Sequence, residues 1–128
     1  MKLILDTSVL IARQPLPPDV DAAISTLSLT ELYFGILTAS DPDTRAYRAA
    51  HLGRVEAAFD ALPLDERVAR ALGQLQAAVT NRGGKHRRRT ADLAIAATAV
   101  VHEATLLTKN YKDLKIVDDL VDVQEPSA

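Results

Sequence analysis

Residues 2–12 read KLILDTSVLIA, and this stretch decides the fold. The apolar run at 3–5 does not alternate with polar residues, which is typical of a strand buried on both faces at the centre of a parallel sheet. A polar turn follows, and residues 9–12 predict one or two helical turns before Pro15 and the next prolines stop the helix. An ionised carboxylate, Asp6, therefore lies directly after a buried strand.

The size and composition of the chain predict one globular domain over residues 1–128. A domain of this length buries roughly two-thirds of its unfolded surface. The 48% hydrophobic and 25% charged content is ordinary for a folded protein and argues against a disordered or membrane protein. The start, MKLILD, is too short for a secretory signal, and no segment reaches the roughly 20 apolar residues of a membrane span. We expect a cytoplasmic protein without membrane contact.

The residue types also limit the chemistry. The chain has no cysteine, so Cys-ligated metal sites are excluded, and any metal must be held by oxygen or imidazole. The net charge is −2, yet five of the 15 basic residues lie within eight positions: Arg82, Lys85, Arg87, Arg88 and Arg89. Such a cluster can attract a polyanion locally. A solvated polar loop is an equally simple explanation.

Strand-like and helix-like segments alternate along the rest of the chain. The expected strands cover residues 2–5, 22–28, 104–108 and 120–123. The expected helices cover residues 28–39, 43–61, 65–79 and 90–104, with Asp65 and Thr90 as N-caps and with the second and third helices forming a hairpin. This alternation predicts an α/β fold, a three-layer α/β/α domain with a central, mainly parallel sheet of four or five strands.

Four acidic residues lie near the expected ends of these strands. Asp6 follows the first strand, Glu31 lies in the first turn of the helix after the second strand, and Asp113 lies beyond the third strand. Asp92 lies in the first turn of the Ala-rich helix at 90–104. Because ligands bind at the carboxyl ends of parallel strands, the four carboxylates are expected to converge at one rim of the sheet.

Each acid also has a simpler explanation. Asp6 could cap the short helix after it, and Ser28 with Glu31 matches the S-x-x-E capping box. Asp92 would be favoured by the dipole of its helix, and Asp113 alone would be a loop residue.

Taken together, the four acids favour a metal site over these separate structural explanations. Carboxylates that share a partly desolvated cleft repel one another unless a cation lies among them. Oxygen ligands without cysteine favour Mg²⁺ or Mn²⁺, which in proteins commonly meet substrate phosphates. This is the chemistry of phosphodiester hydrolysis, and the basic cluster would then contact the phosphate backbone of a nucleic acid.

Four motifs carry a resemblance to a known family: LDTSVLIA at 5–12, SLTELYFGI at 28–36, TADLAIAATA at 90–99 and LLTKNYKD at 106–113. In this order and spacing they resemble the acidic motifs of PIN-domain ribonucleases, specifically the VapC toxins of VapBC toxin–antitoxin modules. The resemblance runs from Lys2 to about Asp113. It implies a PIN-like nuclease domain that cleaves RNA with Mg²⁺ or Mn²⁺ to inhibit growth, forms a homodimer and is inhibited by a VapB-type antitoxin. We expect the antitoxin to bind along the helix from Leu29 and the hairpin after it.

The resemblance also implies roles for individual residues. The catalytic, metal-binding acids are Asp6, Glu31, Asp92 and Asp113. Three further residues are expected to support these acids without binding the metal themselves: Ser8, Thr108 and Asn110. Ser8 and Thr108 would hydrogen-bond to the acids. The residues expected to bind RNA are Lys85, Arg87, Arg88 and Arg89. Because some relatives carry an acid where this chain has Asn110, Asp113 is expected to complete the site, directly or through water.

Three other functions fit parts of the sequence. A PIN-domain RNA-processing nuclease without an antitoxin would carry the same motifs. An aspartyl-phosphate phosphohydrolase with Asp6 as nucleophile would need a second Asp where the chain has Ser8. A receiver-like, Mg²⁺-binding signalling module would use Lys109 after the third strand, but it leaves Glu31 and Asp92 unexplained.

Overall fold

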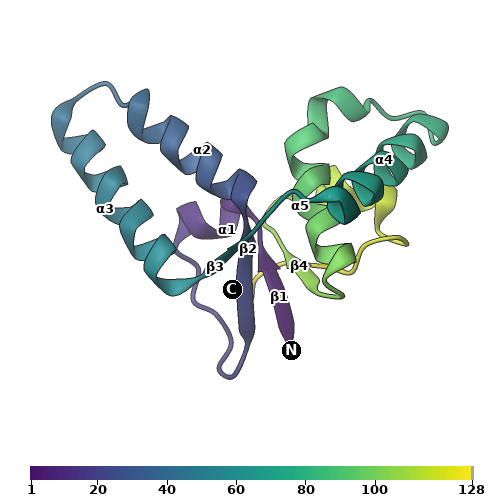
Figure 1. Ribbon diagram of the computed structural model, residues 1–128, viewed down its shortest axis with the longest axis horizontal. Coiled ribbons are helices and arrows are strands. Elements are labelled where there is room, and N and C mark those ends of the chain that lie inside the picture. The colour runs from purple at the N-terminus through teal and green to yellow at the C-terminus, as the bar shows by residue number, and fades with distance from the viewer. Residues whose placement is uncertain (128) are drawn as a thin grey trace.

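The computed structural model describes residues 1–127, apart from the side chain of Arg88. Its centre is a sheet of five strands in the order β3-β2-β1-β4-β5, and every pair of neighbouring strands is parallel (Figure 1). The strands are β1 (Lys2–Leu5), β2 (Asp21–Ser25), β3 (Asp60–Leu62), β4 (Thr105–Leu107) and β5 (Val123–Gln124). The predicted α/β class and mainly parallel sheet are confirmed.

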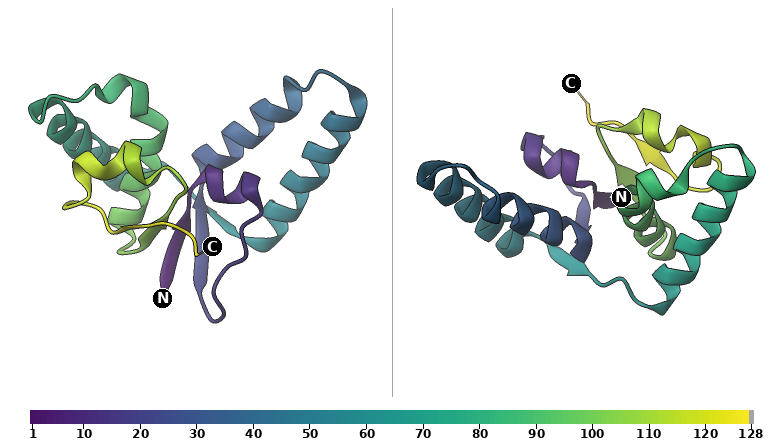
Figure 2. Two further views of the ribbon diagram at one scale, coloured as in Figure 1. Left: turned by 180° about the vertical axis from the view of Figure 1, so that it is seen from behind. Right: turned by 90° about the horizontal axis from the view of Figure 1, so that it is seen from above.

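Helices cover both faces of the sheet. On one side lie α1 (Thr7–Ala12), α2 (Thr26–Leu37) and α3 (Pro42–Ala58), and on the other lie α4 (Glu66–Asn81) and α5 (Thr90–Val101), as Figures 1 and 2 show. The short helices are α6 (Tyr111–Leu114) and the 3₁₀ turns η1 (His86–Arg89) and η2 (Lys115–Val117). Within residues 1–127, no helix has both the length and the hydropathy needed to cross a bilayer.

Strand β1 lies at the centre of the sheet and joins the two hydrophobic cores. Leu3 and Leu5 point to the core under α1, α2 and α3, whereas Ile4 points to the core under α4 and α5. All three side chains are at most 1% exposed. Burial on both faces is the reason that this strand carries an unbroken apolar run.

Two helix starts differ in how well the sequence predicted them. Asp65 caps α4 as predicted, because its carboxylate accepts a hydrogen bond from the Val68 N–H at 3.0 Å. Strand β2, however, ends at Ser25, and helix α2 begins at Thr26 with Ser25 as its N-cap. The predicted strand at 22–28 is therefore too long, because Ser25 rather than Ser28 provides the capping hydroxyl.

The predicted hairpin of two helices after residue 43 is wrong. Helix α3 packs against α2, whereas α4 packs against α5 on the other face of the sheet. The edge strand β3 separates them and carries the chain from one face to the other (Figure 2). A strand of three residues is too short to show a period-2 pattern, so β3 could not be predicted from hydrophobic periodicity.

The last strand is also displaced from its predicted position. Residues 120–123 were expected to form it, but β5 covers Val123–Gln124, and Val121 is instead a buried residue of the preceding turn. The sequence KNYKD at 109–113 predicts a turn, but from Tyr111 the chain forms the short helix α6, which η2 follows.

Candidate metal and catalytic site

The four predicted acids meet at the carboxyl end of the sheet. Asp6 follows β1, Glu31 lies on α2, Asp92 lies in the first turn of α5, and Asp113 lies in α6. The pKa of Asp92 is raised to about 6, first by burial and then by the negative charges of Asp6, Glu31 and Asp113. Each of the three other carboxylates therefore lies within electrostatic reach of Asp92.

Asp6 is fixed by hydrogen bonds from three directions. The residue is only 4% exposed. Its backbone N–H donates to the carbonyl of Leu107 at 2.9 Å. The Oδ2 atom accepts hydrogen bonds from the hydroxyls of Ser8 (2.6 Å) and Thr108 (2.9 Å). Asp6 occupies the N-cap position of α1, but its carboxylate accepts no backbone N–H of that helix and so does not cap it.

The two hydroxyls that hold Asp6 are themselves oriented by the loop after β4. The backbone N–H of Lys109 donates to Ser8 Oγ at 3.1 Å, and the N–H of Asn110 donates to Thr108 Oγ1 at 3.0 Å. Both hydroxyl oxygens thus accept a backbone proton and direct their own protons to the carboxylate. The link from Asn110 runs through its backbone rather than through its side-chain amide.

Glu31 is held by a second pair of hydroxyls. Thr7 Oγ1 donates to Glu31 Oε1 at 2.7 Å, and Thr7 Oγ1 also lies 2.9 Å from Ser28 Oγ. Since Thr7 has one hydroxyl proton and gives it to Glu31, the proton of the second bond comes from Ser28. Glu31 lies beyond the first turn of α2, so the predicted capping box is wrong, and Ser28 supports Glu31 through Thr7.

Sequence reasoning did not identify Thr7 and Ser28 as site residues. Both are buried, with exposures of 6% and 0%. The signal for Thr7 was its position between Asp6 and Ser8 in the turn after a buried strand. Its partner could not be identified, because this required the true start of α2.

Asp92 lies at the start of α5 without the predicted cap. The N-cap position is Arg89, and Thr90 is the first residue of the helix. The hydroxyl of Thr90 instead donates backwards to the carbonyls of His86 and Arg87. The predicted capping role of Thr90 is therefore wrong, whereas the predicted first-turn position of Asp92 is correct.

Arg89 connects two parts of the site. Its guanidinium donates to the backbone carbonyl of Asp113 at 2.8 Å, and its positive charge opposes the rise in the Asp92 pKa. Of the other residues predicted to bind RNA, Lys85 and Arg87 are exposed, and the side chain of Arg88 lies outside the described residues. An RNA-binding role for this loop remains a prediction.

The donor set fits a hard divalent cation. The acids are all carboxylates, and the pKa of Asp92 is raised by burial and by the charges of the three other acids, which a bound divalent cation would offset. Across residues 1–127, no three acidic or histidine side chains surround one ion position, and the residues Glu31 and Asp113 are exposed. Among the described bonds, both hydroxyls fall on Oδ2 of Asp6, which leaves Oδ1 for an ion.

Comparison with known proteins shows the same architecture in one family. Residues 3–120 match the PIN domain family. The chain is 38% identical to Ribonuclease VapC8 of Mycobacterium tuberculosis over 77% of its length and 90% of that protein. It is 34% identical to Ribonuclease VapC5 of the same species, over 94% and 91% of the two chains.

A solved structure agrees over nearly the whole chain. VapBC-5 from Mycobacterium tuberculosis, a member of the VapBC family of toxin–antitoxin systems, matches with a TM-score of 0.83 at 33% identity, covering 99% of this chain and 98% of that one. VapBC2 from Rickettsia felis, at 20% identity and a TM-score of 0.80, shares the fold. The receiver-like and phosphohydrolase alternatives are not favoured. The chain belongs to the PIN-domain family and, within it, to the VapC ribonucleases.

Proposed function

We propose that this protein is a metal-dependent endoribonuclease and the toxin of a type II, VapBC-type toxin–antitoxin module. It would inhibit growth by hydrolysing RNA phosphodiester bonds, and we expect it to act in the cytoplasm. The observation that carries this proposal is the convergence of Asp6, Glu31 and Asp113 on a partly buried Asp92 whose pKa is raised to about 6. Such a group of acids in a VapC relative fits a site for Mg²⁺ or Mn²⁺.

The residues of the site would divide the work as follows. Asp6, Glu31, Asp92 and Asp113 would hold the ion. When bound, the ion would supply an activated water and neutralise charge that develops on the phosphate. Ser8 and Thr108 keep one oxygen of Asp6 occupied, so its other oxygen stays turned to the site. Thr7 does the same for Glu31 by bonding Oε1.

The test is cleavage of structured RNA by the purified protein. We expect cleavage with Mg²⁺ or Mn²⁺, none in EDTA, and a loss of at least about 100-fold in Asp6→Asn, because one ligand becomes neutral. The variant must keep the thermal unfolding profile of the parent. If a folded Asp6→Asn protein cleaves as fast as the parent at matched metal, the site is wrongly assigned.

A VapB-type antitoxin is the proposed protein partner. Its support is the pairing of VapC-like chains with antitoxins in the VapBC-5 complex, together with three exposed apolar side chains on one face of α2. These are Tyr33, Phe34 and Leu37, which are 55%, 66% and 57% exposed. An apolar helical segment would cover this face. Because the predicted hairpin is absent, α2 and its partner α3 present the surface.

We also propose a homodimer, as the family resemblance implies. Light scattering of the purified toxin and of its complex with the protein encoded beside it would test both partners. A monomer that binds no neighbouring gene product would favour a PIN-domain RNA-processing nuclease without an antitoxin.

A further inference from the structure

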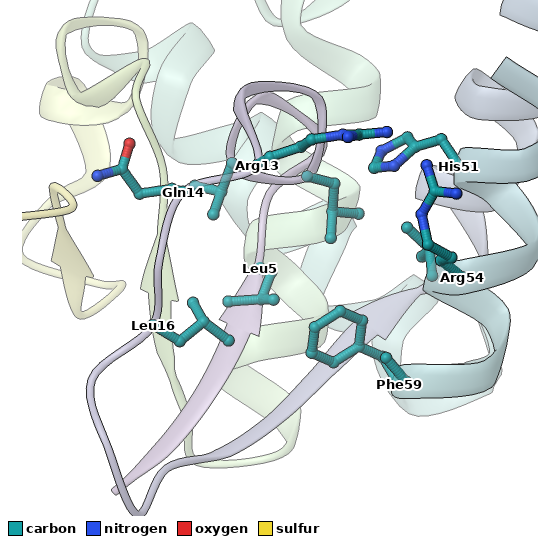
Figure 3. Close-up of a pocket in the computed structure, with 11 residues that line it drawn as sticks. Leu5, Arg13, Gln14, Leu16, His51, Arg54 and Phe59 are labelled. Atoms are coloured by element: carbon teal, nitrogen blue, oxygen red, sulfur yellow. The ribbon is translucent and has the colours of Figure 1, made fainter. Parts of the chain in front are cut away.

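A groove lies along the seam between α1 and α3 and reaches the four acids at Glu31. Its far part is a cavity of about 270 Å³ with Leu5, Leu16 and Phe59 in its wall (Figure 3). Its near part is a hollow of about 300 Å³ that reaches Glu31. The two parts adjoin each other, because Arg13 and His51 line both, and together we call them the α1–α3 groove.

Positive charge lines this groove. Arg13, Arg48, His51 and Arg54 face it, and Glu31 at its near end is the only acid among the described lining residues. Figure 3 shows Arg13, His51 and Arg54 along one side of the far cavity. None of the three arginine side chains forms an ion pair within residues 1–127, whereas the lowered pKa of His51 favours its neutral form. Unneutralised cations beside an apolar wall favour an anionic ligand.

His51 gives independent evidence that the cations lie close together. Its pKa is lowered, first by burial and then by the positive charges of Arg13 and Arg54. Its Nε2 atom is buried and has no hydrogen-bond partner among the described residues. The lowered pKa of His51 therefore indicates that Arg13 and Arg54 lie near one another along the groove.

Aromatic rings complete the lining. The guanidinium carbon of Arg13 lies 4.8 Å from the centre of the Tyr47 ring, yet the Tyr47 residue remains 57% exposed. Phe59 lies at the far end. Helix α3 rises about 17 Å between Tyr47 and Ala58, at 1.5 Å per residue, which is enough for a few nucleotides. A basic groove with aromatic platforms is the usual arrangement for single-stranded nucleic acid.

We propose that the α1–α3 groove holds a single-stranded segment of the RNA substrate next to the scissile phosphate. Arg13 and Arg54 would contact phosphates, and Tyr47 would stack on a base. Glu31 lines the near part of the groove and is also one of the four acids, so a segment bound in the groove would lead to the site. It would lie on the side opposite the basic loop at 85–89. This inference rests on the proposed ribonuclease function and adds the path of its substrate.

The test compares two double variants that lose the same charge. Arg13→Gln/Arg54→Gln removes two groove cations while keeping side-chain length. Arg45→Gln/Arg70→Gln is the matched control, because Arg45 is an exposed residue of α3 outside the groove and Arg70 lies on α4. Binding of an uncleaved single-stranded RNA is measured in EDTA at several salt concentrations. Thermal unfolding checks that both variants are folded.

We expect the groove variant to bind RNA about tenfold more weakly or worse and to flatten the plot of log affinity against log salt by about 1.4, or 0.7 per lost phosphate contact. The control should match the parent. In cleavage assays the groove variant should raise KM more than it lowers kcat, because the two arginines would contact the flanking segment rather than the reacting phosphate. Arg54→Glu, a change at an exposed side chain, should weaken binding further.

Two results would overturn the groove assignment. One is an affinity and salt slope equal to those of the control double variant. The other is unchanged RNA binding with lost binding of the antitoxin, which would make the groove a protein-binding surface. Absence of RNA cleavage by the parent would instead overturn the ribonuclease function, and the binding measurement in EDTA keeps these two failures apart.

Discussion

Asp6 accepts hydrogen bonds from two hydroxyl groups and Glu31 from one, and the tripeptide Asp6-Thr7-Ser8 supplies a donor to each acid. The hydroxyl of Ser8 donates to the carboxylate of Asp6, two residues earlier in the chain. The hydroxyl of Thr7 instead donates to Glu31 on α2. Adjacent residues can serve two acids because the chain passes from β1 into α1 at this point. The turn after the central strand therefore orients two of the four carboxylates.

Replacing Thr7 by Val should separate this role from simple packing. Val keeps the shape but removes the donor to Glu31 and leaves the buried hydroxyl of Ser28 without its acceptor. We expect a loss of about 1–3 kcal/mol in the free energy of unfolding and a 10- to 100-fold loss in metal affinity or cleavage. Thr7→Ser should restore most of both. Thr30→Val, at an exposed residue of α2, the helix that carries Glu31, is the control. It should alter neither stability nor activity.

Asp92 makes the stability of the metal-free protein depend on pH. Its pKa rises from 3.8 to about 6 on folding, so the folded state prefers the protonated form. The stabilisation is complete below about pH 4 and is lost as the pH rises through 6. Asp92→Asn should therefore be more stable than the parent at pH 7.5, by about 1–2 kcal/mol after allowance for solvent screening, and equal to it near pH 4.

Urea unfolding in EDTA at the two pH values checks this prediction. The same variant should lose RNA cleavage, because an amide is a poor substitute for a ligating carboxylate. A parent that is as stable as Asp92→Asn at pH 7.5 would show that burial and the neighbouring acids do not disfavour the charged form of Asp92 in the folded state.

At the scale of single elements, the sequence predicts a helix or strand boundary correctly where hydrogen bonds between residues close in the chain set it. The cap of α4 was correct because Asp65 bonds to a group three residues away. The start of α2 was wrong because Ser25 and Ser28 offer the same chemistry, and the end of β2 decides between them. Strand β3 was missed because its existence depends on pairing with β2, a distant segment.

The α4 cap offers a prediction that concerns the fold alone. Asp65→Ala should destabilise the protein by about 1 kcal/mol, since the Val68 N–H loses its acceptor. Cleavage measured well below the unfolding temperature should stay within about twofold of the parent, because α4 carries none of the four acids. The adjacent change Glu66→Ala, at an exposed residue, is the control for altered charge near the helix start. A matching loss of cleavage in Asp65→Ala would connect α4 to the site.

At the scale of the whole molecule, the parallel sheet explains why the acids could be grouped from sequence. All strands run in one direction, so residues that follow them collect at one rim even when they are about 100 positions apart, as Asp6 and Thr108 are. The α1–α3 groove could not be predicted in this way. Its cations come from α1 and α3, and their meeting depends on how the helices pack.

The whole molecule should also report metal binding through its stability. Mg²⁺ at ten times its dissociation constant should add about 1.4 kcal/mol and raise the Tm by several degrees at pH 7.5. The shift should be smaller at pH 5, where Asp92, with its pKa of about 6, must first lose a proton. Asp6→Asn should show little shift. An equal rise in that variant, or in NaCl of the same ionic strength, would indicate a general salt effect.

The pairing of β1 with β4 connects the folding of the chain to its chemistry. Leu5 lies opposite Leu107, and the next residue, Asp6, donates its N–H to the carbonyl of Leu107. A slip of one residue between these strands would turn the side chains of one strand to the opposite faces of the sheet. It would also separate Asp6 from Thr108. Cleavage per molecule after refolding would then count the chains with correct strand pairing. The site could thus serve as an assay of folding fidelity, because a slipped chain keeps its helices and loses its turnover.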